Sequence, residues 1–283
     1  MSNKQNIRQE QKTKQNSGEK ISTKKREPVS GAVSYPSEGN HNCFQIEAQS
    51  FWFLHRNQVI AEIFQRFVPE GSRVFDIGGG NGFVSALLRE KGYTPVLVEP
   101  GSDGIRNARE RGIEHLIHAR FEDAGFIDES IDHAGLFDVV EHIENDRAFL
   151  LALYNKLKPG GKVILTVPAW AFLWSEVDAL SGHFRRYTLK KLQMLLYNTG
   201  FSYCYGTYFF SFLPLPIFLF RSLPGLFPFI LKRKQVSRES EHRPESKTIR
   251  RIIAFFAQAE MKRFEKGKRI PFGSSCLVVA EKK

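Results

Sequence analysis

Short apolar runs alternate with amphipathic segments through the middle of the chain. The pattern predicts strands over 73–77, 94–99, 115–118, 131–138 and 162–168, with helices over 82–91, 103–111 and 146–157 between them. A helix over 47–68 precedes these elements, and a helix over 189–199 and strands over 201–209 and 274–281 follow them. Alternation of this kind is typical of an α/β fold with a parallel sheet and helices on both faces.

The expected first helix is rich in aromatic residues. Its apolar positions cover too much of the helix surface to form one narrow stripe. Two interpretations remain open, namely packing in the core and a lid over a ligand cleft, and core packing is the simpler of the two.

An unusual insertion separates the last two expected strands, over about 209–267. Residues 208–231 are nearly all aromatic or aliphatic, but four prolines interrupt them. A membrane-spanning helix needs about 20 predominantly apolar residues, so this segment is not expected to cross a bilayer. The basic residues that follow suit contact between 208–234 and an anionic membrane surface. A cap over a substrate pocket and a dimer contact are the alternatives. A helix over 247–264 is expected to pack on the domain.

The chain has 283 residues and a formal net charge of +11. Residues 1–42 hold 8 Lys and Arg against 4 acids, and residues 232–251 hold 8 against 3, so most of the excess charge lies in these two segments. Low apolar content predicts that 1–42 is a disordered basic tail without a signal peptide. We therefore expect one domain over 43–281. Because that domain is close to neutral and carries no recognised nucleic-acid-binding motif, nucleic acid is not an expected partner.

The three cysteines form no C-x-x-C pair. This argues against a disulfide framework or a metal site. Cys204 and Cys276 fall in predicted strands and are expected to be buried in a cytoplasmic protein, which could be peripheral on the inner membrane face.

The first predicted strand ends in Asp76 and continues directly into a loop with glycines at 78, 80 and 82. Such a loop lets the backbone approach a ligand closely. A dinucleotide-binding fingerprint would place its third glycine at position 83, which is Phe83 here. Glu99 ends the second strand, where a carboxylate can accept hydrogen bonds from both hydroxyls of a ribose. Both NAD and S-adenosylmethionine carry that ribose.

Acidic residues follow four of the predicted strands. They are Asp76, Glu99, Glu122, Asp123, Asp138 and Glu141. A pyrophosphate prefers bare helix N-terminal amides, whereas an acidic rim favours a cationic ligand such as a sulfonium. Three classes of function remain: a methyltransferase, an NAD(P)-dependent oxidoreductase or epimerase, and a non-catalytic module that binds a membrane surface.

The order of residues 76–82, Glu99, 137–143 and 157–162 resembles that of the class I S-adenosylmethionine-dependent methyltransferases. The resemblance covers about 43–281. It implies a Rossmann-like, doubly wound sheet of seven mostly parallel strands, with an antiparallel last strand between the fifth and the sixth. It also implies methyl transfer to a small-molecule or lipid-linked acceptor. The cofactor residues that it implies are Asp76, Gly78, Gly80, Gly82, Glu99, Phe121, Glu122 and Asp138. Many relatives have an acid where this chain has Arg120.

The segment after the fifth strand leaves the sheet at the edge where ligands bind. Its candidates for substrate binding are Trp174, Asp178, His183, Arg185, Arg186 and Tyr187. The two arginines could hold a phosphate or carboxylate, or could pair with Asp178 or Glu176. His142 and His183 are candidates for a general base, and for each an ordinary structural role is the alternative. The G-H-x-R-R-Y-T segment and an F-W-F-x-x-R-N lead-in resemble a bacterial subgroup associated with surface polysaccharide or lipid-linked sugar synthesis.

Overall fold

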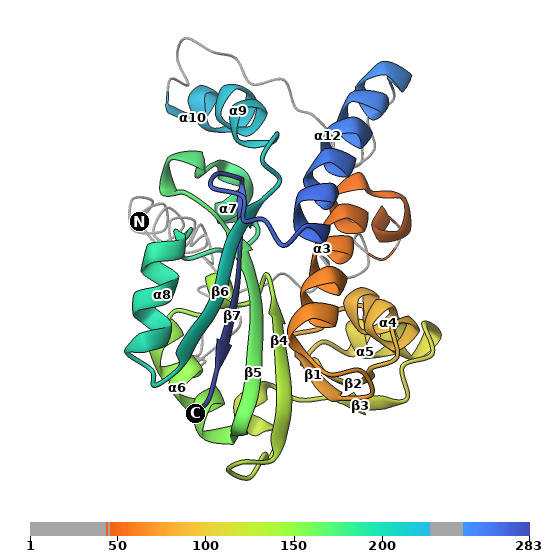
Figure 1. The fold of residues 1–283 in the computed structure, drawn as a ribbon, viewed down its shortest axis with the longest axis vertical. Helices are drawn as coiled ribbons and strands as arrows, with labels where there is room; N and C mark the ends of the chain where they lie inside the picture. Colours follow the sequence, from red (N-terminus) through yellow and green to blue (C-terminus); the bar gives the residue numbers. More distant parts are fainter. Residues whose placement is uncertain (1–43, 45, 227–245) are drawn as a thin grey trace, which may run out of the picture. The chain divides into compact units, whose positions relative to one another are not determined.

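The computed structural model describes residue 44 and residues 46–226 and 246–283. The predicted tail 1–42, Cys43 and most of the basic stretch 232–251 lie outside the described residues. Within the described part, seven strands form one sheet in the order β3-β2-β1-β4-β5-β7-β6 (Figure 1). The strands are β1 (Arg73–Ile77), β2 (Thr94–Val98), β3 (His115–Ile117), β4 (Ile131–Phe137), β5 (Leu157–Pro168), β6 (Ser202–Phe209) and β7 (Ser275–Glu281).

Strands β1 to β5 pair in parallel, and β7 runs antiparallel between β5 and β6. This order confirms the expected doubly wound sheet. From β1 the chain moves outward to β2 and β3, then returns to place β4 on the other side of β1. In open α/β sheets such a switch point leaves a crevice beyond the carboxyl ends of the strands, where ligands bind.

Helices cover both faces of the sheet, and the central strands are buried on both sides. One face packs against α6 (Asp146–Lys156) and α8 (Leu189–Tyr197). The other packs against α3 (Phe51–Phe67) and α4 (Phe83–Glu90), while α5 (Ser102–Glu110) packs on Leu97 of β2. A one-turn helix, η1 (Glu47–Gln49), precedes α3, so the predicted helix over 47–68 is divided in two.

The insertion between β6 and β7 contains α9 (Pro214–Ile217), η5 (Phe218–Ser222), α10 (Leu223–Leu226) and α12 (Lys247–Glu265). None of the helices in the described ranges is long and apolar enough to cross a bilayer. A buried carboxylate, that of Glu260, joins α12 to the domain. It lies 2.8 Å from Nε2 of His55 on α3, and it accepts hydrogen bonds from the amides of Phe210 and Ser211 at the end of β6.

The C-terminal part of α12 packs on the domain as predicted, through Glu260 and Phe264, whereas Ile249, Ile252 and Phe256 are exposed. The prediction that Cys204 is buried is wrong, because this residue is exposed, whereas Cys276 is buried as expected. The register between β6 and β7 shifts between Tyr203 and Tyr205, and Cys204 is the extra residue of that irregularity on the edge strand.

Candidate functional site

A cavity of about 440 Å³ lies at the carboxyl ends of β1, β2 and β4. Its lining includes seven of the eight residues that the resemblance implies for the cofactor, namely Asp76, Gly78, Gly80, Glu99, Phe121, Glu122 and Asp138. Residues that are far apart in the sequence therefore meet at the switch point of the sheet.

The glycine-rich loop has two functions in the structure. Gly78 and Gly80 line the cavity with φ angles of +70° and +52°, in the left-handed region that favours glycine. Gly82 does not line the cavity. It precedes α4 with a φ of +72°, and a Cβ atom there would lie 2.9 Å from the Cβ of Ala108 on α5. Gly82 therefore permits a turn and close packing between two helices.

Two carboxylates are fixed beside this loop. Asp76 is buried and accepts a 2.6 Å hydrogen bond from the Ser85 hydroxyl. Burial raises the pKa of Asp76 to about 6, although the Ser85 hydrogen bond and the charge of Arg56 oppose the shift. Glu99 accepts hydrogen bonds from the amides of Gly80 (3.0 Å) and Gly101 (2.8 Å). These two amides orient the Glu99 carboxylate, which lines the cavity.

Asp138 follows β4 with a φ of +58°, which is uncommon for a residue other than glycine. Its carboxylate forms an ion pair with Arg56 of α3 and accepts a 3.2 Å hydrogen bond from the Thr166 hydroxyl. The Arg56 guanidinium also lies over the rings of Trp52 and Phe53, at 5.0 and 5.4 Å from their centres. Trp52, Phe53 and Arg56, which all belong to α3, line the cavity.

Helix α3 therefore contributes both to the wall of the cavity and to the core. Its first turns border the cavity, and the side chains of Val59, Ile60, Ile63 and Phe64 pack in the core. The sequence prediction did not assign Arg56 to the site. The F-W-F-x-x-R-N lead-in, which contains Arg56, was the signal that could have identified it.

Glu47 is a further carboxylate of the cavity that the sequence prediction missed. It is buried and accepts hydrogen bonds from Asn81 Nδ2 (3.1 Å) and Arg111 Nη2 (2.7 Å). Asn81 in turn accepts a 2.9 Å hydrogen bond from Asn107 on α5. Burial raises the pKa of Glu47, and the nearby Arg111 charge opposes this. The network fixes the segment before α3 against the glycine-rich loop.

Two histidines border the cavity beyond Asp138. The rings of His142 and His183 are 4.7 Å apart between centroids and nearly perpendicular. Burial, followed by the charge of His183, lowers the pKa of His142 to about 4, so His142 is neutral at physiological pH. Glu141 lies next to them, fully buried. Its burial, and then the charge of Asp138, raise the pKa of Glu141 well above the ordinary value.

Asp178 and Arg186 form a buried, two-pronged ion pair. Arg186 Nε and Nη2 donate to the two carboxylate oxygens at 2.7 and 3.0 Å, and Asp178 Oδ1 also lies 3.0 Å from His183 Nδ1. Burial alone would raise the pKa of Asp178, but the hydrogen bonds from His183 and Arg186 outweigh it and lower this pKa. Of the two alternatives for Arg186, ligand binding or pairing with an acid of the same segment, the structure shows pairing with Asp178.

Two other candidates for substrate binding, Arg185 and Tyr187, contact Asp146 outside the cavity. Arg185 pairs with Asp146 at 2.8 Å, and the Tyr187 hydroxyl donates to the same carboxylate at 2.7 Å. Of the six candidates, only His183 lines the cavity. Those that do not line it are Trp174, Asp178, Arg185, Arg186 and Tyr187.

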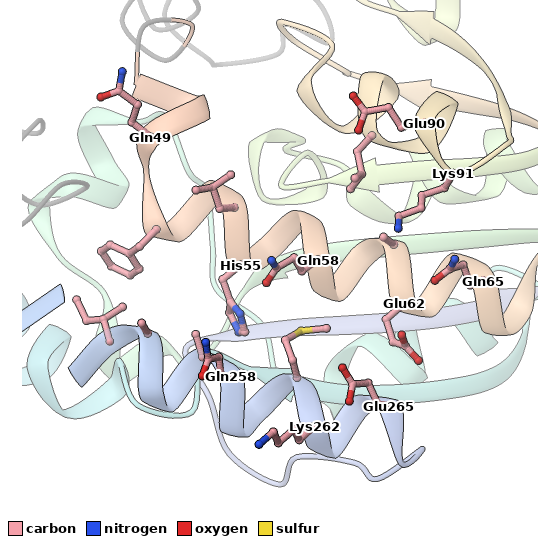
Figure 2. Close-up of a pocket in the computed structure, with 18 of the residues that line it drawn as sticks. Gln49, His55, Gln58, Glu62, Gln65, Glu90, Lys91, Gln258, Lys262 and Glu265 are labelled. Atoms are coloured by element: carbon pink, nitrogen blue, oxygen red, sulfur yellow. The ribbon is translucent and has the colours of Figure 1, made fainter. Parts of the chain in front are cut away.

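A larger hollow, of about 890 Å³, lies between α3 and α12 (Figure 2). Figure 2 shows His55 pointing from α3 toward α12, with polar side chains such as Gln58, Glu62 and Lys262 around the groove. Neither the glycine-rich loop nor any residue predicted for the site borders it. The residues predicted for the cofactor therefore gather at the smaller cavity.

Comparison with known proteins agrees with this geometry. Residues 52–204 match the model of the family described as "Methyltransferase domain". A ubiquinone biosynthesis O-methyltransferase of Xanthomonas axonopodis pv. citri is 29% identical over 107 residues, which are 36% of this chain and 45% of the relative. The ubiquinone/menaquinone biosynthesis C-methyltransferase UbiE of Vibrio vulnificus is 28% identical over 148 residues, which are 48% and 55% of the two chains.

The chain thus spans about half the length of these curated relatives. Among solved structures, a SAM-dependent methyltransferase of Thermotoga maritima, described as a possible histamine N-methyltransferase, has the same fold. Its TM-score is 0.54 at 19% identity, with coverage of 87% of this chain and 96% of that one. The family model covers more than half of the sequence and agrees with the strand order. This chain therefore belongs to the class I S-adenosylmethionine-dependent methyltransferases.

Proposed function

We propose that this protein transfers a methyl group from S-adenosylmethionine, bound in the 440 Å³ cavity, to a small-molecule or lipid-linked acceptor. The observation that supports it most is the acidic lining of the cavity, where Glu47, Asp76, Glu99 and Asp138 surround the glycine-rich loop. Carboxylates favour a cationic ligand. When bound, S-adenosylmethionine supplies a methyl group on a positively charged sulfur.

The residues of the cavity suit the separate parts of this ligand. Glu99 is oriented to accept hydrogen bonds from two ribose hydroxyls. Arg56 and Asp138 lie side by side, so together they can bind the carboxylate and the ammonium of an amino-acid group. Phe121 offers an apolar ring to a base.

His142 and His183 border the end of the cavity beyond Asp138, and we place the acceptor there. Methyl transfer requires the acceptor atom, the methyl carbon and the sulfur to lie in line, and most of the rate comes from holding that geometry. An acceptor that carries a proton must also lose it. A neutral imidazole can accept that proton directly or help to bind the acceptor.

The exposed surface of the insertion supports a lipid-linked acceptor or a membrane partner. Leu219 and Phe220 of η5 are exposed, as are Ile252 and Phe255 of α12, and Arg250 and Arg251 are exposed on the same helix. Apolar side chains flanked by basic ones suit an anionic lipid surface. The resemblance to the subgroup associated with lipid-linked sugars points to the same class of acceptor.

An NAD(P)-dependent oxidoreductase or epimerase is the alternative, because it would also use Glu99. The structure supports this alternative less well, since Phe83 begins α4 and several carboxylates surround the glycine-rich loop, whereas a pyrophosphate favours helix N-terminal amides. The proposal can be tested by incubating the protein and methyl-labelled S-adenosylmethionine with polar and lipid extracts. Labelled product in either extract is expected, and a lipid product would favour the lipid-linked acceptor. No labelled product in any extract would contradict the activity.

A further inference from the structure

A carboxylate and two imidazoles meet at the acceptor end of the cavity. Glu141, His142 and His183 each contribute one potential metal-binding atom, and these atoms all lie within 4.8 Å of one another. Across 46–226 and 246–283, together with residue 44, no other group of His, Cys, Asp and Glu side chains has this geometry. The sequence predicted no metal site, because its three cysteines form no C-x-x-C pair, whereas the residues that meet here are two histidines and a glutamate.

Glu141 carries a fully buried carboxyl group. Its residue is 0% exposed, and neither of its carboxylate oxygens has a hydrogen-bond partner in the part of the chain described by the structure. Buried carboxylates are normally hydrogen-bonded, paired with a cation or bound to a metal. The backbone brings His183 to this carboxylate, because the amide of Phe184 donates a 2.8 Å hydrogen bond to the carbonyl of Glu141.

His183 is oriented as a metal-binding histidine would be. Its Nδ1 lies 3.0 Å from Asp178, whose carboxylate is paired with Arg186 and can only accept. The proton of the ring therefore belongs on Nδ1, which leaves the lone pair of Nε2 for a ligand. A carboxylate behind a metal-binding imidazole is a recurrent arrangement that fixes both its tautomer and its orientation.

We propose that Glu141, His142 and His183 bind a divalent transition-metal ion, such as Mn²⁺ or Zn²⁺, at the acceptor end of the cavity. Two imidazoles and one carboxylate are a suitable ligand set for such ions, and three protein ligands leave coordination positions open. The role of the ion rests on the proposed methyl transfer: an acceptor with oxygen atoms would bind at the open positions. A hydroxyl bound there would lose its proton more readily.

The test uses the full-length protein after treatment with a chelator. Mn²⁺ is titrated into the protein in the presence of excess Mg²⁺, and free Mn²⁺ is measured by electron paramagnetic resonance. We expect one Mn²⁺ per chain, displaced by Zn²⁺, and at least tenfold weaker binding in Glu141→Gln and His183→Asn. Glu144→Gln and His118→Asn, which change exposed residues, should bind as the unaltered protein does.

The absence of stoichiometric Mn²⁺ binding would overturn the proposal, as would equal affinity in Glu141→Gln and His183→Asn and in the unaltered protein. Circular dichroism reports whether each variant folds, and calorimetry with S-adenosylhomocysteine measures cofactor binding separately. If Glu141→Gln fails to fold, His183→Asn decides, because that side chain borders the cavity and is partly exposed. Metal binding without any affinity for S-adenosylhomocysteine would support this site and contradict the proposed methyl transfer instead.

Discussion

Arg56 on α3 forms an ion pair with Asp138, the residue that follows β4, and joins the first long helix to the switch point of the sheet. Arg56 is largely buried and its charge also lies over Trp52 and Phe53. A buried pair of opposite charges on the wall of a cavity is complementary to a zwitterion, and the amino-acid end of S-adenosylmethionine is one.

This pair predicts a selective loss of affinity in Arg56→Ala. Binding of S-adenosylhomocysteine should weaken by about 1.5 to 3 kcal/mol, the usual contribution of a hydrogen bond to a charged group. Binding of 5′-methylthioadenosine, which lacks the amino-acid group, should change little. Calorimetry with the two ligands measures the difference, and Arg109→Ala on exposed surface is the control. Equal losses for both ligands would remove Arg56 from the amino-acid end of the site.

The two roles of the glycine-rich loop predict that Gly82→Ala reduces stability more than Gly71→Ala. Both residues have φ near +70° to +80°, so each variant should lose about 1 to 2 kcal/mol from backbone strain. A Cβ at Gly71 would meet nothing within 4 Å, whereas one at Gly82 would crowd Ala108. Overpacking typically costs about 1 to 3 kcal/mol more. Urea denaturation measures the two losses, and equal values would contradict the packing role of Gly82.

The raised pKa of Asp76 predicts a pH dependence of stability. Burial raises it from 3.8 to about 6, so the folded state holds this proton more tightly than the unfolded state does. The contribution to stability is complete below about pH 4 and is lost as the pH rises through about 6. Each pKa unit corresponds to about 1.4 kcal/mol, so the loss should be on the order of 3 kcal/mol.

Denaturation of the ligand-free protein between pH 4 and 7 measures this slope. The slope should be reduced in Asp76→Asn, whose amide oxygen can still accept the Ser85 hydrogen bond, and should persist in Asp123→Asn, an exposed control. An unchanged slope in Asp76→Asn would show that Asp76 is ionised at lower pH than its burial implies.

The exposed apolar face of α12 predicts binding to anionic vesicles. Replacing both Ile252 and Phe255 by Asp should reduce cosedimentation with such vesicles severalfold, because it removes apolar contact and adds negative charge. The matched control carries Ile127→Asp and Leu151→Asp, which place the same charges at exposed apolar positions elsewhere. Equal cosedimentation of the two double variants would exclude α12 as the contact surface.

The sequence predicted the fold well because strands and helices have local signatures. Asp76 and Glu99 could be assigned for the same reason, since each ends an apolar run at a known edge of a parallel sheet. The pairing of Arg186 with Asp178 was one of two open alternatives, and only three-dimensional packing could decide between them. Glu47, Arg56 and the approach of His183 to Glu141 depend on contacts between distant segments, which periodicity does not encode.

Isothermal titration calorimetry of the purified protein with S-adenosylhomocysteine and with NADH tests the central claim most directly. We predict that S-adenosylhomocysteine binds and NADH does not, and that Glu99→Ala weakens the binding by at least about 1.5 kcal/mol. Glu114→Ala, at an exposed position, should bind with unchanged affinity. Binding of NADH without binding of S-adenosylhomocysteine would contradict the account.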